Sequence, residues 1–276
     1  GIMSLRQRLS YIGVTGVTRR SETEALLKSA EKAFPSGFNR QIMIGVLASL
    51  KTLHGKSHGK PQHYPPLQNI KDIFVKHDLA LNLIHYATKE PETLCDQLLK
   101  LSDATPGVLN GFQLNIAWPN REQIDKFLTV AVLSGESWSP TLVLQVGRRA
   151  MEMTENSPEK VATKVSEYVG LVDYVLLDPS GGSGEFMNPQ ETETYLQAIQ
   201  ARNLEMGLVV AGGLSELSVK SLVGPLALKY PDLSTDAEER LRDALDTLDV
   251  VASEFYLQKT VELFSPKPTS TEPAAL

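Results

Sequence analysis

The chain has 276 residues, a formal net charge of −6, and hydrophobic and charged contents of 42% and 22%, which are typical of a globular protein. The negative charge argues against nucleic acid and anionic membranes as partners, and no apolar run approaches the ~18 residues of a membrane-spanning helix. A single cysteine, Cys95, excludes an internal disulfide and a thiolate metal cluster. Since no signal-peptide pattern opens the chain, we expect a cytoplasmic protein.

Short apolar runs recur about every thirty residues, and each is followed by an amphipathic stretch, which is the pattern of repeated strand–helix units. The runs that we predict to be strands are 11–16, 42–47, 79–86, 111–116, 141–147, 174–177 and 207–214. An eighth candidate, 232–237, is short and polar. A continuous helix is predicted from Leu241 to Phe264, because apolar residues recur there at helical spacing.

Eight such units in about 250 residues predict an α/β fold, a single-domain (β/α)₈ TIM barrel over residues 1–264. Residues 265–276 are rich in proline, serine and threonine, and we expect them to form a disordered tail. The alternative is a doubly wound open sheet. It predicts a G-x-G-x-x-G fingerprint in the first unit, where residues 13–18 read Gly-Val-Thr-Gly-Val-Thr instead.

In such a barrel the carboxyl ends of the strands and the loops that follow them share one mouth. Asp178 ends the sixth strand under a glycine-rich turn, which favours a catalytic acid or base, although a capping role for the turn is the alternative. Gln113 and Asn115 share a parity and should both point into the lumen, where they bind a ligand or bond each other. The other ligand-binding candidates are His85, Gln145, Arg148 and Ser180.

The loop over residues 49–67 is predicted to be long and basic. No Asp or Glu occurs between Lys32 and Lys71, and the loop carries Lys51 together with three histidines. A basic loop at the mouth of an acidic protein favours an anionic ligand, which Lys51 would help to bind, whereas the alternative is a solvated surface loop. The histidines lie on a Gly/Pro-rich stretch that gives them no fixed common face, so we predict no metal site there.

The segment 211–215, Ala-Gly-Gly-Leu-Ser, follows the seventh strand and is predicted to bind phosphate at Gly212 and Gly213. Glycines expose backbone N–H groups, and the N-terminus of the next helix carries partial positive charge. In (β/α)₈ barrels a phosphate often binds between the loops after strands seven and eight, which is where this segment lies.

Together these segments resemble the phosphoribosylanthranilate isomerase family of ribulose-phosphate-binding barrels. Residues 14–19 resemble that family's first strand, 113–115 its Q-L-H-G strand, 176–184 its L-L-D…G-G-T-G segment, and 211–214 match its A-G-G-L loop. The resemblance implies that Asp178 is the general acid and that Gly182, Gly212, Gly213 and Ser234 belong to the phosphate site.

Two positions depart from that family. Thr15 stands where the family has its cysteine base, and a threonine hydroxyl is not a base near neutral pH. Asp236 replaces a glycine of the eighth-strand turn, where a carboxylate would repel a phosphate dianion. The chain is therefore expected to be a diverged relative that does not catalyse the family's own isomerisation, with Thr15 and Asp178 marking its catalytic positions.

Three functions remain open. The first is an enzyme of isomerase or lyase type that acts, without a cofactor, on a small anionic metabolite, either phosphorylated or carrying another anionic group. The second uses Mg²⁺ held by Asp178, Asp236 and Glu238. The third is a non-catalytic binding or scaffold barrel, which predicts a filled mouth and Arg148 and Arg149 paired with carboxylates. The sequence leaves the oligomeric state undetermined.

Overall fold

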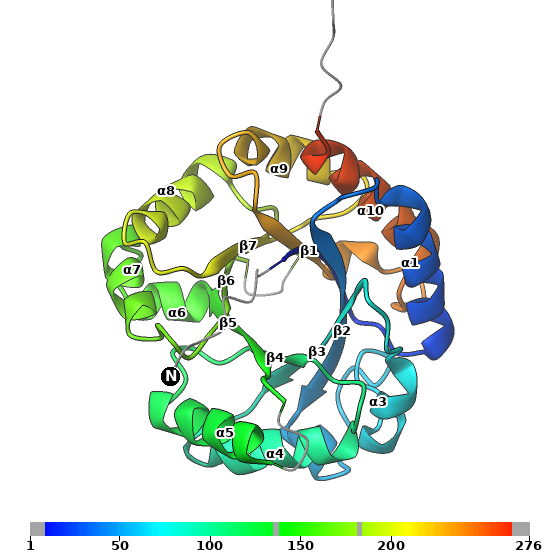
Figure 1. The fold of residues 1–276 in the computed structure, drawn as a ribbon, viewed down its shortest axis with the longest axis vertical. Helices are drawn as coiled ribbons and strands as arrows, with labels where there is room; N and C mark the ends of the chain where they lie inside the picture. Colours follow the sequence, from blue (N-terminus) through cyan, green and yellow to red (C-terminus); the bar gives the residue numbers. More distant parts are fainter. Residues whose placement is uncertain (1–8, 135–137, 181–183, 267–276) are drawn as a thin grey trace, which may run out of the picture.

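Eight parallel strands close into a barrel in sequence order, with β8 adjacent to β1 (Figure 1). The structure is a computed structural model that describes residues 9–134, 138–180 and 184–266. Its strands are β1 (Ser10–Thr15), β2 (Arg40–Ser49), β3 (Ala80–Ala87), β4 (Gly111–Leu114), β5 (Thr141–Gly147), β6 (Tyr174–Asp178), β7 (Gly207–Ala211) and β8 (Ser234–Ala237). The chain is thus a (β/α)₈ barrel, as the sequence predicts.

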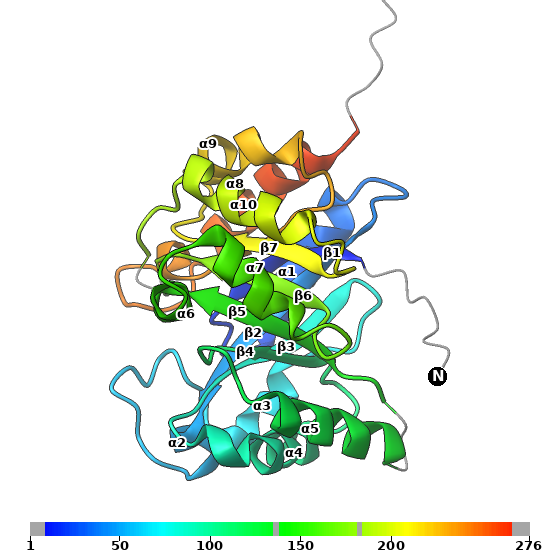
Figure 2. The same cartoon turned by 90° about the vertical axis from the view of Figure 1, so that its left-hand side faces the viewer.

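A ring of helices surrounds the strands, and the two views show it from the end and from the side (Figures 1 and 2). The helices are α1 (Arg20–Ala33), α2 (Leu50–Leu53), α3 (Leu67–Ile73), α4 (Leu94–Ala104), α5 (Arg121–Leu133), α6 (Arg148–Met153), α7 (Pro158–Ser166), α8 (Pro189–Gln200), α9 (Val219–Ala227) and α10 (Val250–Phe264). Two short 3₁₀ turns, Pro91–Thr93 and Glu239–Leu241, precede α4 and follow β8. Among the described residues, no helix is long and apolar enough to cross a bilayer.

Several helices begin where the sequence places a capping side chain. The side chains of Asn120, Ser157 and Asn188 accept hydrogen bonds from backbone amides in the first turns of α5, α7 and α8. These bonds satisfy donors that a helix N-terminus otherwise leaves unpaired. The helices α5, α7 and α8 therefore start at positions that their capping side chains specify.

The lumen is filled by every second residue of each strand, as alternation along a strand requires. Its lower part is an apolar cluster whose members are Tyr11, Met43, Leu81, Leu83, Val143, Tyr174, Leu176, Val209 and Ala211. The residues of opposite parity face the helices and form the larger core between strands and helices. The lumen is therefore closed by packing below, and its polar residues lie nearer the carboxyl ends of the strands.

The structure confirms the faint eighth strand and corrects the helix after it. β8 pairs with both β1 and β7, so it closes the barrel despite its polar sequence. The predicted continuous helix 241–264 is wrong, because residues 242–249 form a turn and Leu245 is 80% exposed. The Asp243 side chain accepts bonds from the amides of Leu245 and Thr247, which diverts these groups from helical bonding. The predicted tail lies outside the described residues beyond position 266.

Candidate functional site at the barrel mouth

A cavity of about 340 Å³ lies at the carboxyl ends of the strands. Ligand pockets in proteins usually begin at about this size, and in (β/α)₈ barrels the active site occupies this end. Its walls bring together distant parts of the chain: Gln113, Asn115, Gln145, Asp178, Ser180, Gly212, Gly213, Asp236, Glu238, Glu239, Lys60, His63, Tyr64 and Arg240 are among the lining residues. Asp178 and the glycine pair after β7, predicted to share one mouth, therefore line one cavity.

Three side chains form a hydrogen-bonded row across β3, β1 and β8. The Thr15 hydroxyl donates to Asp236 Oδ1 at 2.6 Å, and His85 Nδ1 lies 3.5 Å from the same hydroxyl. The His85 ring reaches Thr15 across β2 because Gly45 has no side chain, and a Cβ there would lie 2.9 Å from His85 Nε2. Burial lowers the pKa of His85 to about 3, so the ring is neutral. The row therefore holds Asp236 in place by a donated hydrogen bond.

Two carboxyl groups at the end of β8 titrate far above their usual range. Burial, and the negative charge of Asp178, raise the pKa of Asp236 to about 7 in spite of the bond from Thr15. Burial and the charges of Asp236 and Glu239 raise the pKa of Glu238 to about 8. Since both pKa values lie near neutral pH, both groups can accept or donate a proton at physiological pH, which is the property of a general acid or base.

Asp178 lies at the end of β6 and is 5% exposed. Its Oδ1 accepts hydrogen bonds from the Ser180 hydroxyl at 2.5 Å and from the Ser180 amide at 3.1 Å. This is the turn-capping arrangement that the sequence left as an alternative, and it coexists with a position in the cavity wall. The two bonds fix the orientation of the Asp178 carboxyl group, so Ser180 positions Asp178 in addition to lining the cavity.

The wall formed by β4 and β5 carries side-chain amides. Gln113 Nε2 donates to Asn115 Oδ1 at 2.9 Å, so the two residues bond each other as one sequence alternative predicts. Gln113 is 2% exposed and its Oε1 has no partner among the described residues. Both residues and Gln145 line the cavity. This wall therefore presents an unsatisfied buried acceptor, for which a bound ligand or water is the usual partner.

The glycine pair after β7 is covered by the segment that follows β6. Gly212 and Gly213 have φ of +128° and +71°, which only glycine adopts freely. A Cβ on Gly213 would lie 2.7 Å from the Phe186 ring, and the Met187 amide donates to the Gly212 carbonyl at 3.0 Å. The two glycines therefore allow residues 184–187 to pack closely over the loop, while both still line the cavity.

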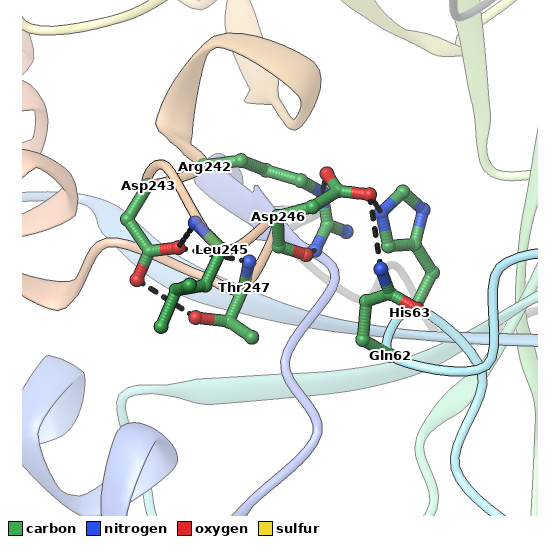
Figure 3. Close-up of polar contacts among 7 residues, drawn as sticks. All are labelled: Gln62, His63, Arg242, Asp243, Leu245, Asp246 and Thr247. Atoms are coloured by element: carbon green, nitrogen blue, oxygen red, sulfur yellow. Dashed lines mark hydrogen bonds and ion pairs between the residues drawn. The ribbon is translucent and has the colours of Figure 1, made fainter.

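Two loops that project from the same side of the molecule meet at the mouth, one after β2 and one after β8 (Figure 2). His63 is 3% exposed and lies 2.7 Å through Nε2 from Asp246 Oδ2, and Gln62 Nε2 approaches the same oxygen at 3.5 Å (Figure 3). His63 and Tyr64 line the cavity, and Tyr64 stacks on His58 at 4.0 Å. Asp246 thus fastens the predicted basic loop over the cavity rim.

The turn 242–249 is built to present Asp246. Asp243 holds the turn through two backbone amides and the Thr247 hydroxyl, as Figure 3 shows. Arg242, 4% exposed, donates through Nη1 to the Asp246 carbonyl at 3.3 Å, and its Nη2 packs against Gly16, which has no side chain. The hydrogen bond from His63 is the main cause that lowers the pKa of Asp246, so this carboxylate is ionised.

Five predicted site residues do not line the cavity. Thr15 and His85 lie in the lumen but are enclosed by the row they form with Asp236. The Ser234 hydroxyl faces the lower lumen and accepts a bond from the Tyr11 amide at 2.8 Å. Lys51 is exposed on α2, and Arg148, at the start of α6, pairs with Glu185 at 2.6 Å, as the scaffold alternative predicts. Gly182 lies outside the described residues.

Among the polar lining residues, seven were not predicted as substrate contacts, namely Lys60, His63, Tyr64, Asp236, Glu238, Glu239 and Arg240. The unusual charge and length of the loop after β2 indicate its importance but not which side chains turn inward. Glu238 was considered only as a metal ligand. Within the described part of the chain, no group of three His, Cys, Asp or Glu side chains is placed to hold a metal ion, and Asp178, Asp236 and Glu238 do not form one.

A second cavity of about 620 Å³ lies at the opposite end of the barrel. It is lined by the start of β7 and by the loops that precede β7 and β8, including Leu204, Met206, Leu208 and Tyr230. Loops at this end of a (β/α)₈ barrel contribute to stability, whereas catalytic groups come from the carboxyl ends of the strands. The cavity at the mouth is therefore the candidate functional site.

Comparison with known proteins shows the fold and no closer relationship. No protein-family model matches the chain, and no curated protein matches it. Phosphoribosylanthranilate isomerase from Thermotoga maritima superimposes with a TM-score of 0.58 at 16% identity, over 92% of this chain and all of that chain. The enzyme from Thermococcus kodakaraensis gives 0.55 at 14%, over 92% and 99%.

Other (β/α)₈ enzymes are nearly as similar. A citrate lyase from Burkholderia xenovorans gives a TM-score of 0.54 at 12% identity, over 95% of this chain and 78% of that chain. The catalytic domain of a chitinase from Pyrococcus furiosus gives 0.51 at 11%, over 93% and 96%. At these identities the likeness establishes the barrel and leaves the reaction to be argued from the site.

Proposed function

We propose that this protein is an enzyme of isomerase or lyase type that moves protons on a small metabolite bound at the barrel mouth. Asp178 and Asp236 act as its acid–base pair. The observation that carries the proposal is that these two carboxyl groups line one cavity, where burial and, to a smaller extent, the charge of Asp178 raise the pKa of Asp236 to about 7. Pairs of titratable groups whose surroundings separate their pKa values are typical of proton-transfer sites.

The geometry assigns different tasks to the two groups. Ser180 donates two hydrogen bonds to Asp178, which fix the orientation of this carboxyl group in the cavity wall, where it would remove a proton. The raised pKa of Asp236, about 7, suits this group to deliver a proton near neutral pH. Thr15 contacts Asp236 and not the cavity, so it positions the acid by hydrogen bonding. Asp236 thereby supplies the second proton-transfer group that the threonine cannot provide.

The phosphate site expected at Gly212 and Gly213 is not part of this proposal. Four carboxyl side chains line the same cavity, against the basic side chains of Lys60 and Arg240. Two of these carboxyl groups, Asp236 and Glu238, would repel a phosphate dianion whenever they are ionised. The presence of glycine at position 213 is explained without a phosphate, since Phe186 packs directly on Gly213 where a side chain would lie.

Deuterium incorporation tests the proposal without knowledge of the substrate. The protein is incubated in D₂O with a protein-free cell extract, and mass spectrometry records which compounds gain deuterium. We expect at least one compound to gain deuterium with the wild-type protein and not with Asp178→Asn or Asp236→Asn. Glu185→Gln, which removes an exposed carboxylate outside the cavity lining, is the matched control and should retain the exchange. Exchange that persists in both aspartate variants, or none with the wild type, contradicts the proposal.

A further inference from the structure

Four carboxyl side chains are gathered in the cavity wall. Asp178, Asp236, Glu238 and Glu239 contribute carboxyl groups from β6 and from the end of β8. Within the described part of the chain, Asp236, Glu238 and Glu239 form no ion pair with a basic side chain. Carboxylates gathered without a close ion-pair partner are costly to ionise, and a ligand that brings positive charge would reduce that cost.

A second, independent acceptor lies on the opposite wall. Gln113 is 2% exposed and lines the cavity, and its Nε2 is used by Asn115, which leaves Oε1 without a partner in the described structure. An unpaired buried carbonyl oxygen costs about 1–3 kcal/mol, so its natural partner is a hydrogen-bond donor on a ligand. Two walls of the cavity, built from different strands, would therefore both be satisfied by a ligand that donates hydrogen bonds.

The basic side chains near the cavity are engaged elsewhere. Arg240 donates through Nε to the Gly184 carbonyl at 2.7 Å, and its guanidinium lies 3.9 Å from the centre of the Phe186 ring. Arg242 packs on Gly16 and bonds the Asp246 carbonyl. Lys60 lines the rim on the loop after β2 and remains the one competitor for the carboxylates among these three side chains. The positive charge of Arg242 also acts on Glu238 and lowers its pKa, so the charge of the β8 end is compensated only in part.

We propose that the ligand of this cavity is a small organic cation, of about the size of one sugar ring, that carries a protonated amine and several hydroxyl groups. The amine lies against Asp236 and Glu238, and a hydroxyl or amine hydrogen is donated to Gln113 Oε1. The volume of about 340 Å³ accommodates a molecule of this size. The inference names the substrate class of the proposed enzyme, and in that respect it rests on the proposed function.

The raised pKa values of Asp236 and Glu238 agree with this inference. Repulsion between neighbouring carboxylates contributes to both shifts, so a bound cation should lower both pKa values. Binding of the cation near neutral pH should then release protons. Isothermal titration calorimetry in buffers of different ionisation enthalpy measures that release directly.

Three probes that share one scaffold test the charge of the ligand. Glucosamine is cationic near neutral pH, glucose is neutral, and glucose 6-phosphate is anionic. With the full chain at low salt, we expect glucosamine to bind at least about tenfold more tightly than glucose, with glucose 6-phosphate weakest, and to release protons on binding. Tighter binding of glucose 6-phosphate or of inorganic phosphate overturns the inference, and so does equal or undetectable binding of all three sugars.

Variants locate the binding to the two walls. Glu238→Gln and Gln113→Leu should each weaken glucosamine binding about fivefold or more, whereas Glu185→Gln should not change it. Unchanged binding in both cavity variants overturns the inference, and thermal melts establish that each variant is folded. Deuterium exchange that depends on Asp178 and Asp236 but acts on a neutral or anionic compound would retain the proposed function and reject the cationic ligand. Glucosamine binding to a protein that shows no deuterium exchange would instead retain the cationic ligand and reject the proposed function.

Discussion

The lower and upper parts of the lumen are built from the same strands, but the lower part is packed with apolar side chains and the upper part is lined by polar ones. Leu83, Val143 and Leu176 belong to the apolar cluster, and the residues two positions later are His85, Gln145 and Asp178. One step of strand alternation therefore separates close apolar packing from a polar cavity wall. The lower part gains stability from burial, whereas the upper part gives up stability to hold carboxyl groups at raised pKa values. This division locates the chemistry at one end of the barrel.

The largest effect should come from the lower part. Leu83→Ala removes a fully buried side chain from the lumen cluster and should lower the free energy of unfolding by about 2–5 kcal/mol. Urea denaturation measures the change, with Val132→Ala on the exposed face of α5 as a control that should lose less than about 0.5 kcal/mol. A loss below about 1 kcal/mol for Leu83→Ala would show that the lower part of the lumen does not contribute the stability assigned to it.

In the upper part, removing a charge should stabilise the protein. The pKa of Asp236 is about 7 in the folded protein and about 4 in the unfolded chain, so the folded state binds the proton more tightly. Stability therefore falls as pH rises from about 4 through 7. Asp236→Asn keeps an acceptor for Thr15 and should raise the free energy of unfolding by about 1–3 kcal/mol at pH 8.5, with little change at pH 5.

Melting curves of wild type and Asp236→Asn at the two pH values measure this difference. A variant that is equally stable or less stable than the wild type at pH 8.5 would mean that the ionised carboxyl group does not lower the free energy of unfolding. The contrast between the lower and upper parts of the lumen would then fail.

Above the cavity, the His63–Asp246 contact should control the loop that covers it. Asp246→Asn weakens this bond, and we expect amide hydrogen exchange in residues 54–66 to increase by roughly threefold to tenfold. Glu31→Gln is the matched control, since His77 and Glu31 form a pair of the same 2.7 Å length on an exposed surface. Equal exchange in the loop in both variants would show that Asp246 does not fasten it.

The smallest effect is expected at the rim of the mouth. Arg148 and Glu185 form a close pair with side chains 50% and 66% exposed, and such pairs contribute little. Arg148→Ala should change the free energy of unfolding by less than about 0.5 kcal/mol and leave deuterium exchange intact. A loss of exchange in this variant would return Arg148 to the ligand-binding role that the sequence suggested for it.

Most of the fold could be predicted because a strand buried on both faces leaves a continuous apolar run, as in residues 42–47. β8 is the exception, since Ser234 and Asp236 face the lumen and Thr235 bonds Tyr256 of α10. The apolar spacing that suggested a helix from Leu241 misled because Asp243 captures the amides of its own turn. Local side-chain bonding of this kind overrides periodicity over one or two turns.

The candidate site could be predicted only in part. Strand parity places Gln113 and Asn115 in the lumen, and the end of the sixth strand places Asp178 at the mouth, but neither signal says whether a lumen residue reaches the cavity. His85 is enclosed because Gly45 lets its ring cross β2 to Thr15. The pairing of Asp236 with Thr15, more than 200 residues apart in the chain, follows only from closure of the barrel.

The carboxyl ¹³C resonance of Asp236, followed by NMR as pH is varied and assigned by its loss in Asp236→Asn, tests the central claim most directly. The account predicts a titration midpoint near pH 7, and a shift of that midpoint to lower pH when glucosamine is added. A midpoint near 4, the value of an ordinary aspartate, would contradict it, because the group would then be a solvated anion and not a proton donor at the mouth.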